Sequence, residues 1–179
     1  MSTWSFTHIR KNPAVSDSAI ESIIRAETNG ARSLARLNGE YSFKDRDDCE
    51  WMLVTPNGFG DLSEEAAESC RRMSEHFETT VVMTFGQGNC MGMVFAVFER
   101  GLLIRHVSAA DGVLYANTGE PFAWETEVFG DLSDESVGLY EGTLHKIAER
   151  LGLSGYNSSE RWTVDRIVSL SSPPPLPRI

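Results

Sequence analysis

Four strand-like runs joined by short connections constrain the fold more than any other feature of this 179-residue sequence. Arg100-Gly101 separates the second run from the third, and "AADG" separates the third from the fourth. Such connections are too short for crossover helices, so the strands should pair antiparallel as a meander. The second run is apolar at almost every position, which predicts a central strand covered on both faces. The runs are "TTVVMTF" (79–85), "MVFAVFE" (93–99), "LLIRHVS" (102–108) and "VLYANT" (113–118).

Segments with helical spacing of apolar residues accompany these strands. The clearest is 62–77, where apolar residues recur at steps of four, four, three and four. Gly152 should cap the last helix. The other expected elements are helices at 16–27 and about 134–151, strands at 3–10 and 51–56, a hairpin turn at Asn38-Gly39, and a strand or docked arm at 160–170. We therefore predict an α+β fold, with an antiparallel meander sheet of four or more strands packed by two to three helices.

The domain organisation follows from length and composition. The chain fits one α+β domain over residues 1–170, followed by a proline-rich flexible tail, "SPPPLPRI", within 171–179. No apolar run approaches the roughly 20 residues of a membrane-spanning helix, and the first residues lack the pattern of a signal peptide. Three cysteines without a C-x-x-C pair are typical of reduced thiols. We expect a cytoplasmic protein without membrane contact.

The net charge of −10 is concentrated in the middle of the chain. Residues 47–142 hold 18 acidic and four basic side chains, whereas each flanking segment has a small positive balance. So acidic a segment repels phosphate backbones, which argues against nucleic-acid binding. It either attracts a basic protein partner or serves only to keep the protein soluble.

The glycine-rich stretch "TFGQGNCMGM" (84–93) invites comparison with a phosphate-binding loop. A dinucleotide-binding loop needs a helix directly after its glycines, but "MVFAVFE" follows here and has no helical pattern. The stretch is therefore predicted to be a hairpin connection, and no cofactor is expected. His8, His76, His106 and His145 have no zinc-ligand spacing, so no metal is expected either. Without a catalytic motif, no catalytic residue is assigned; Cys90 remains a candidate nucleophile only in principle.

"GEPFAWE" (119–125) supports two interpretations. It either closes the end of the sheet with solvated acids around it, or forms an acidic rim around an aromatic anchor that binds a partner. The residues of that candidate partner-binding rim are Glu120, Trp124, Glu125, Glu127 and Asp131. In both cases Trp124 should hold the bend against the sheet.

Arg105 is expected to have a structural role. If Arg100-Gly101 is a two-residue turn, Ala96 opposes Arg105 and Phe95 opposes His106, with Leu103 and Val107 beside the arginine on one face. A guanidinium between apolar neighbours needs an acceptor. We predict an ion pair between Arg105 and either Glu120 or Glu125.

A sequence pattern over residues 51–130 resembles small uncharacterised bacterial proteins of the immunity type. The pattern is a G-x-x-x-R strand, here Gly101 to Arg105, closed by G-x-P-x-x-W-E, here Gly119 to Glu125. The resemblance implies a cytoplasmic protein that neutralises a cognate toxin by binding it, and the acidic middle of the chain suits a basic toxin. It implies no catalytic residue, and the oligomeric state is open.

The alternative hypothesis is a small-molecule-binding domain or an enzyme. Its site would be assembled around Arg105, His106 and Glu125, because an arginine on a strand can hold a carboxylate ligand through two hydrogen bonds.

Overall fold

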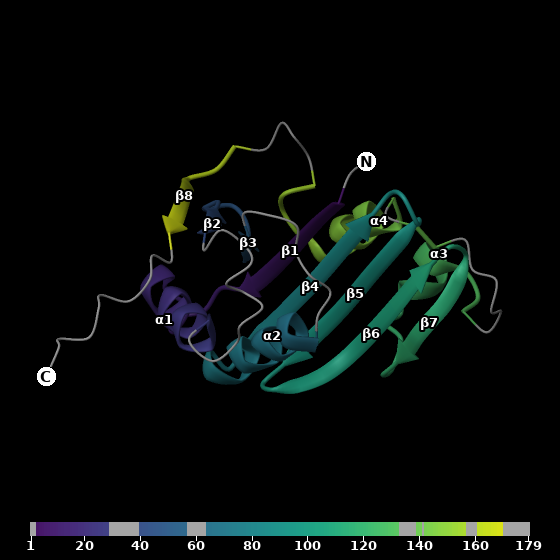
Figure 1. Cartoon of the computed structure of the whole chain (residues 1–179), viewed down its shortest axis with the longest axis horizontal. Helices are drawn as coiled ribbons and strands as arrows, with labels where there is room; N and C mark the ends of the chain where they lie inside the picture. Colours follow the sequence, from purple (N-terminus) through teal and green to yellow (C-terminus); the bar gives the residue numbers. More distant parts are fainter. Residues whose placement is uncertain are drawn as a thin grey trace, which may run out of the picture.

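The computed structural model of the protein describes residues 3–28, 40–56, 64–132, 139–140, 142–156 and 161–169. These residues form a single sheet with helices on both sides (Figure 1). The elements are β1 (Thr3–Arg10), α1 (Asp17–Thr28), β2 (Glu40–Asp45), β3 (Trp51–Pro56), α2 (Glu64–His76), β4 (Thr80–Gln87), β5 (Gly92–Glu99), β6 (Leu102–Ala110), β7 (Val113–Thr118), α3 (Glu125–Phe129), α4 (Thr143–Leu151) and β8 (Val164–Ser169).

The sheet has eight strands in the order β7-β6-β5-β4-β1-β3-β2-β8, and every pair is antiparallel. β4 to β7 are neighbours in sequence order, so the predicted meander and the α+β class are confirmed. The strand β1 lies between β4 and β3 and joins the meander to the N-terminal strands. The hairpin between β4 and β5 contains the glycine-rich stretch, as predicted.

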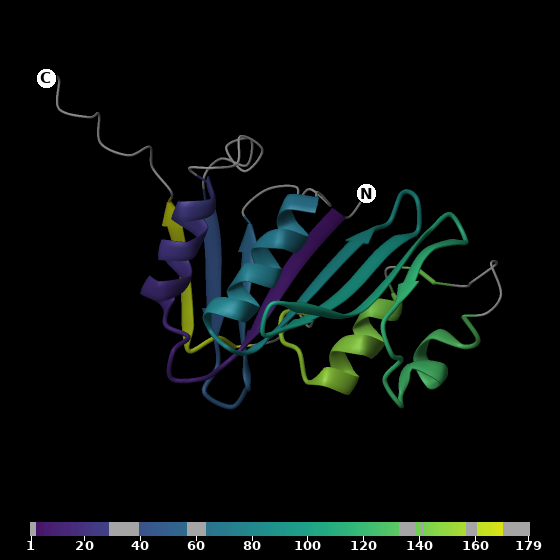
Figure 2. The same cartoon turned by 90° about the horizontal axis from the view of Figure 1, so that it is seen from below.

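Two faces of the sheet carry separate cores. The helices α1 and α2 cover one face, and α3 and α4 cover the other (Figure 2). We call these the α1–α2 face and the α3–α4 face. Residues of β5 from Gly92 to Phe98 are all buried, and they point alternately into the two cores. The prediction of a central strand covered on both faces is confirmed.

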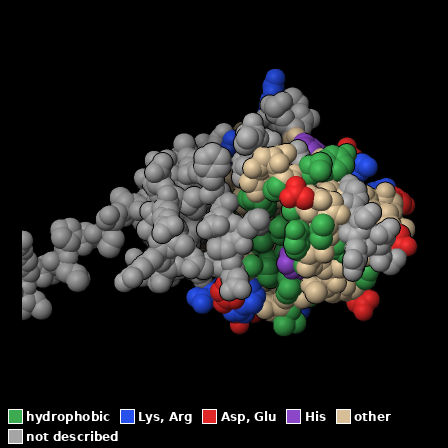
Figure 3. Space-filling view, turned by 45° about the vertical axis from the view of Figure 1, so that its right-hand side comes forward, with side chains coloured by type: hydrophobic (Ala, Val, Ile, Leu, Met, Phe, Trp, Pro, Cys, Tyr) green, Lys and Arg blue, Asp and Glu red, His purple; other side chains and the backbone are tan. Residues whose placement is uncertain are grey.

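The α1–α2 face is not covered over its whole width. α2 lies over β4 and β5 and reaches only the start of β6. Beyond it, hydrophobic side chains gather in the middle of the described surface (Figure 3). Leu103 on β6 is 49% exposed, and on β7 Val113 and Tyr115 are 46% and 69% exposed.

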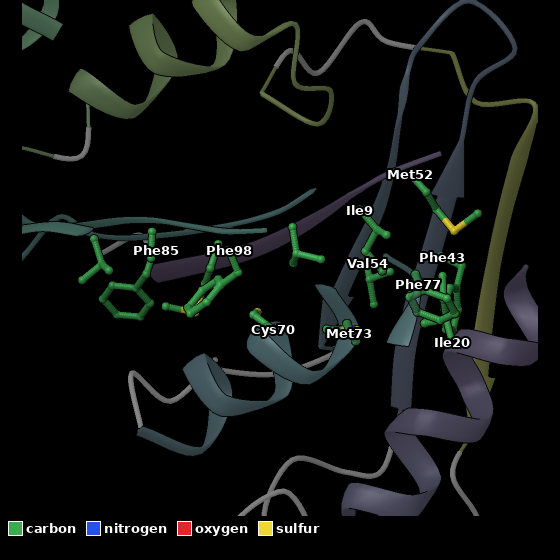
Figure 4. Packing of buried hydrophobic residues seen from close by; sticks show 14 residues of the cluster. Ile9, Ile20, Phe43, Met52, Val54, Cys70, Met73, Phe77, Phe85 and Phe98 are labelled. Carbon is green, nitrogen blue, oxygen red and sulfur yellow. The ribbon is translucent and has the colours of Figure 1, made fainter. Parts of the chain in front are cut away.

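The core of the α1–α2 face is almost purely apolar (Figure 4). Cys70 and Met73 of α2 point at the sheet, and Ile20 of α1 packs near Phe43 and Phe77. The predicted apolar stripe of α2 is therefore confirmed from Ala66 to Phe77, whereas Leu62 lies outside the described residues. Cys70 is 2% exposed and belongs to the core, as its position on the stripe predicts.

Two tight turns connect β5 to β6 and β6 to β7 within the meander. Arg100 and Gly101 have φ angles of 48° and 83°, and Asp111 and Gly112 have 51° and 77°. Two successive residues with positive φ are the pattern of a type I′ turn, whose twist matches that of antiparallel strands. The first turn also contacts α2, because the Gly101 N–H donates a hydrogen bond of 2.9 Å to Ser74 Oγ.

The predicted register between β5 and β6 is wrong beyond the first residues. Glu99 opposes Leu102 as expected, but a β-bulge leaves Ile104 without a cross-strand partner. Val97 therefore opposes Arg105, and Ala96 opposes His106. One extra residue shifts all later side chains to the other face. Leu103 and Arg105 consequently point to opposite faces.

The helix predictions need two corrections. The last helix begins at Thr143 and not near 134, since Leu139 and Tyr140 are not helical; 133–138 and 141 lie outside the described residues. Gly142 at the N-cap position explains the later start, because glycine disfavours helix interiors. Gly152 does end this helix in the left-handed conformation, with its N–H bonded to Ala148 O. The short α3 raises the helix count to four within the described part of the chain.

Segment 160–170 contains β8, so the strand interpretation is confirmed there. The predicted Asn38-Gly39 turn and the 171–179 tail lie outside the described residues. No helix in the described ranges is both long and apolar enough to cross a membrane.

Candidate functional site

The side chain of Arg105 lies at the centre of the closing motif and is fully buried. Its guanidinium forms a two-pronged ion pair with Glu125, which is 3% exposed. Nε donates to Glu125 Oε1 at 2.9 Å, and NH2 donates to Oε2 at 2.7 Å. The predicted ion pair is confirmed, and Glu125 rather than Glu120 is the partner.

The remaining donors of Arg105 are also satisfied. NH1 donates to the carbonyl oxygens of Thr118 and Gly119, and NH2 donates to Asn117 Oδ1 at 2.8 Å. A guanidinium has five N–H donors, and the five are used by groups of the protein itself. Arg105 therefore offers no donor to a carboxylate ligand without giving up one of these hydrogen bonds.

The β-bulge at Ile104 and the residue Gly119 determine the position of the ion pair between Arg105 and Glu125. Gly119 has a φ of 86°, and a Cβ there would lie 1.9 Å from Ile104 O, the carbonyl of the bulged residue. Only glycine permits that close approach. Gly119, which opens the G-x-P-x-x-W-E motif, thus brings the chain against the bulge. Glu125, which ends the motif, bonds Arg105 next to the bulge. These contacts give the motif a structural explanation within this fold.

Trp124 holds the same segment against the sheet, as predicted. Its ring stacks on Phe122 at 5.5 Å and lies 6.0 Å from both Phe95 of β5 and Phe129 of α3. The indole is half-buried among these rings and belongs to the core of the α3–α4 face. Aromatic pairs at such distances contribute packing energy beyond the area they bury.

A pocket of about 440 Å³ opens between α3 and the end of β7. Arg105 and Glu125 lie at its inner wall, and residues closer to the surface line its mouth. Its lining consists of Arg105, Asn117, Pro121, Glu125, Thr126, Phe129, Gly130, Asp131 and Leu132. His106 is not among them, because it points to the opposite face of the sheet together with Ala96.

The residues of the predicted acidic rim separate into two groups. Glu120, Glu127 and Asp131 are exposed around α3, and Glu127 is paired with Arg150 of α4. Glu125 is buried with Arg105 and is not part of an exposed rim, because a carboxylate on the strand-facing side of α3 meets the guanidinium instead of solvent. The partner-binding role of the three exposed acids remains a prediction.

The three residues of the alternative small-molecule site are divided between two faces. Arg105 and Glu125 lie on the α3–α4 face, whereas His106 is half-buried on the other face. Burial, and then the charge of Arg105, lower the pKa of His106. The structure does not bring these three side chains together around one cavity.

A buried polar cluster on the α3–α4 face is the feature that sequence reasoning missed. His8 of β1 is completely buried, and its Nε2 lies 2.7 Å from Ser154 O. Its ring stacks on Tyr156, whose hydroxyl forms a hydrogen bond with Thr84. Burial lowers the pKa of His8 to about 4 and raises that of Tyr156. Only the alternation of Trp4, Phe6 and His8 hinted at this position.

Among the described residues, the cysteines and potential metal ligands form no assembled site. Cys49, Cys70 and Cys90 are all free thiols. Within the described ranges, no group of three or more His, Cys, Asp or Glu side chains could hold a metal ion. Cys90 lies in the β4–β5 hairpin, and its thiol is 3.9 Å from Gln87 O.

Comparison of the chain with protein-family models, curated proteins and solved structures found no match.

Proposed function

We propose that this protein binds a basic protein partner through the end of the molecule formed by β6, β7 and α3, and that it acts as an immunity-type protein in the cytoplasm. The partner would be a toxin that is inactivated when this surface covers it. The proposal combines the sequence resemblance to immunity-type proteins with the exposed hydrophobic and acidic side chains at this end of the molecule.

The observation that carries the proposal is a set of exposed hydrophobic side chains along β6 and β7 with exposed acids beside them. Protein-binding surfaces typically have an apolar or aromatic centre and a polar rim. Here Leu103 of β6 and Val113 and Tyr115 of β7 are large exposed hydrophobic side chains. In Figure 3 hydrophobic side chains gather in the middle of the described surface, and acidic ones lie at its margin. Exposed acids near its borders include Glu99, Asp111 and Glu120.

The charge supports a basic partner. Residues 99–131, which build this end, hold six acidic side chains and two basic ones. Complementary charge accelerates encounter and excludes acidic competitors. A toxin must be captured quickly, so electrostatic steering fits the proposed role.

The small-molecule alternative has less support. The pocket beside Arg105 has a suitable volume. However, its arginine is already bonded to Glu125, Asn117 and two carbonyl groups. A carboxylate ligand would have to displace one of these partners of the buried guanidinium, at a cost of the order of 1–3 kcal/mol.

The decisive experiment is co-expression of this protein with each toxin-like protein encoded by neighbouring genes. We expect growth rescue and co-purification with one of them. Tyr115→Lys should weaken the complex at least tenfold, because it places a cation among the exposed hydrophobic side chains of β7 that a basic partner would face. Tyr140→Lys is the matched control, since Tyr140 is also exposed (47%) but lies before α4. Failure of every neighbouring protein to bind, or equal effects of the two variants, would refute the proposal.

A further inference from the structure

The two edge strands of the sheet differ in their protection against pairing with another chain. β8 carries the charged residues Asp165 and Arg166 in its middle, whereas β7 has no charged residue from Val113 to Thr118. Charges on edge strands discourage the addition of a further strand. No strand among the described residues pairs with the outer side of β7. β7 is therefore the edge better suited to accept one.

A second copy of this chain is a poor candidate for that added strand. If two β7 strands paired antiparallel with Val113 opposite Thr118, Asp111 of one copy would lie opposite Glu120 of the other. Both side chains are exposed and acidic. Like charges directly opposite each other destabilise a strand pair. The same two acids would favour a strand that carries basic residues.

The pocket next to β7 supplies a specific contact for such a strand. In strand addition, backbone hydrogen bonds provide affinity and pockets for alternate side chains provide specificity. Asn117 of β7 and Thr126 of α3 both line this pocket, so it adjoins the edge. Arg105 and Glu125 neutralise each other at its inner wall, and Asp131 adds a negative charge at the surface. The lining therefore has a net charge of −1 and suits a cation.

We propose that the partner adds an extended, basic segment to the outer side of β7 and inserts a lysine or arginine side chain into the pocket between β7 and α3. This inference rests on the proposed function, because it specifies how the basic protein partner binds. It also predicts the chemistry of the segment, which would alternate basic and apolar residues.

The test uses synthetic peptides and the full chain. The probe is an acetylated octapeptide of alternating arginine and valine, and its comparison peptide has glutamate in place of arginine. We expect the arginine peptide to bind at least tenfold more tightly by fluorescence anisotropy. Hydrogen exchange should slow in residues 113–118 on binding and remain unchanged in β8.

A pocket variant separates strand addition from general attraction to acids. Thr126→Arg places a cation in the pocket and should weaken binding of the arginine peptide at least tenfold. Ser22→Arg adds the same charge on the exposed surface of α1 and should have little effect. Absent binding of the arginine peptide, unchanged exchange at 113–118, or equal binding by the two variants would each overturn the inference.

The outcome is distinguishable from failure of the proposed function. If a neighbouring toxin binds and Tyr115→Lys disrupts the complex, but 113–118 gains no protection, the function stands and strand addition is wrong. If the peptide binds as described but no neighbouring toxin does, the edge site stands and the immunity role is wrong.

Discussion

The two faces of the sheet are held together by different chemistry. The α1–α2 face has an apolar core, in which Ile9, Met73 and Phe77 pack between the sheet and its helices. The α3–α4 face also has an apolar core but buries the ionisable groups His8, Arg105 and Glu125 within it, with Tyr156 half-buried beside His8. Consecutive residues of one strand illustrate the contrast, since His8 and Ile9 are both completely buried on opposite sides of β1.

This difference indicates how the stability of each face should respond to substitutions and to a change of pH. Apolar packing loses stability in proportion to the volume removed, with little dependence on pH. Buried ionisable groups depend on their partners and on their charge state, so one substitution or a change of pH leaves a costly group unsatisfied. The α3–α4 face should be the more sensitive of the two, and it carries the candidate site.

The largest effect should follow from breaking the buried ion pair. Glu125→Ala leaves the Arg105 guanidinium buried without its carboxylate, and we expect a loss of about 3–5 kcal/mol in the free energy of unfolding. Arg105→Ala should cost a similar amount. Urea denaturation of the purified variants measures both.

A double variant shows whether the cost comes from the unpaired charge. Arg105→Met combined with Glu125→Leu replaces the pair with apolar side chains and should recover much of the lost stability. Single variants that unfold at the wild-type midpoint would contradict a structural role for the pair.

The next effect is the pH dependence caused by His8. Its pKa is about 4 in the folded state and 6.5 in the unfolded state, so its contribution is fully present above pH 6.5. As the pH falls from 6.5 to about 4, the unfolded chain takes up the proton first. Stability should drop by roughly 3 kcal/mol over that interval.

The matched variant for this effect is His8→Gln. An amide can still donate to Ser154 O but does not titrate, so the variant should lose less stability than the wild type between pH 7 and pH 4. The unfolding free energies of the variant and of the wild type are compared at the two pH values. The difference between their pH dependences separates the contribution of His8 from that of the carboxylates. Identical pH profiles would show that His8 does not govern acid sensitivity.

A smaller effect is expected from the neighbouring residue on the other face. Ile9→Val removes one buried methylene group and should destabilise by about 0.5–1.5 kcal/mol. The loss should be the same at pH 7 and pH 4, because no titratable group is involved. A strong pH dependence of this difference would show that the two faces are energetically coupled.

The smallest effect should occur where α2 no longer covers the sheet. Leu103→Thr changes a half-exposed side chain and should alter stability by no more than about 0.5 kcal/mol. Phe98, its cross-strand neighbour, is 4% exposed and serves as the contrast: Phe98→Ala should be strongly destabilising. Equal thermal shifts for the two variants would mean that the uncovered surface is part of the core.

The sequence by itself determined the features that depend on local spacing. Short turns at Arg100-Gly101 and Asp111-Gly112 left only an antiparallel meander, and the continuous apolar run of β5 required cover on both faces. The need of a buried guanidinium for an acceptor predicted its pairing with a nearby glutamate. These inferences succeeded because each rests on a few consecutive residues or on one strong energetic requirement.

Only the tertiary structure decided the features that depend on distant segments. The insertion of β1 between β3 and β4, and the burial of His8 against Ser154, join residues that are far apart in the chain. The bulge at Ile104 was also invisible in the sequence, yet it sets which face Arg105 occupies and separates it from Leu103. Side chains along a strand point alternately to the two faces of the sheet, so one unpaired residue reverses the face predicted for every residue after it. That reversal placed Arg105 on the α3–α4 face, where it meets Glu125, one of the two glutamates expected to pair with it.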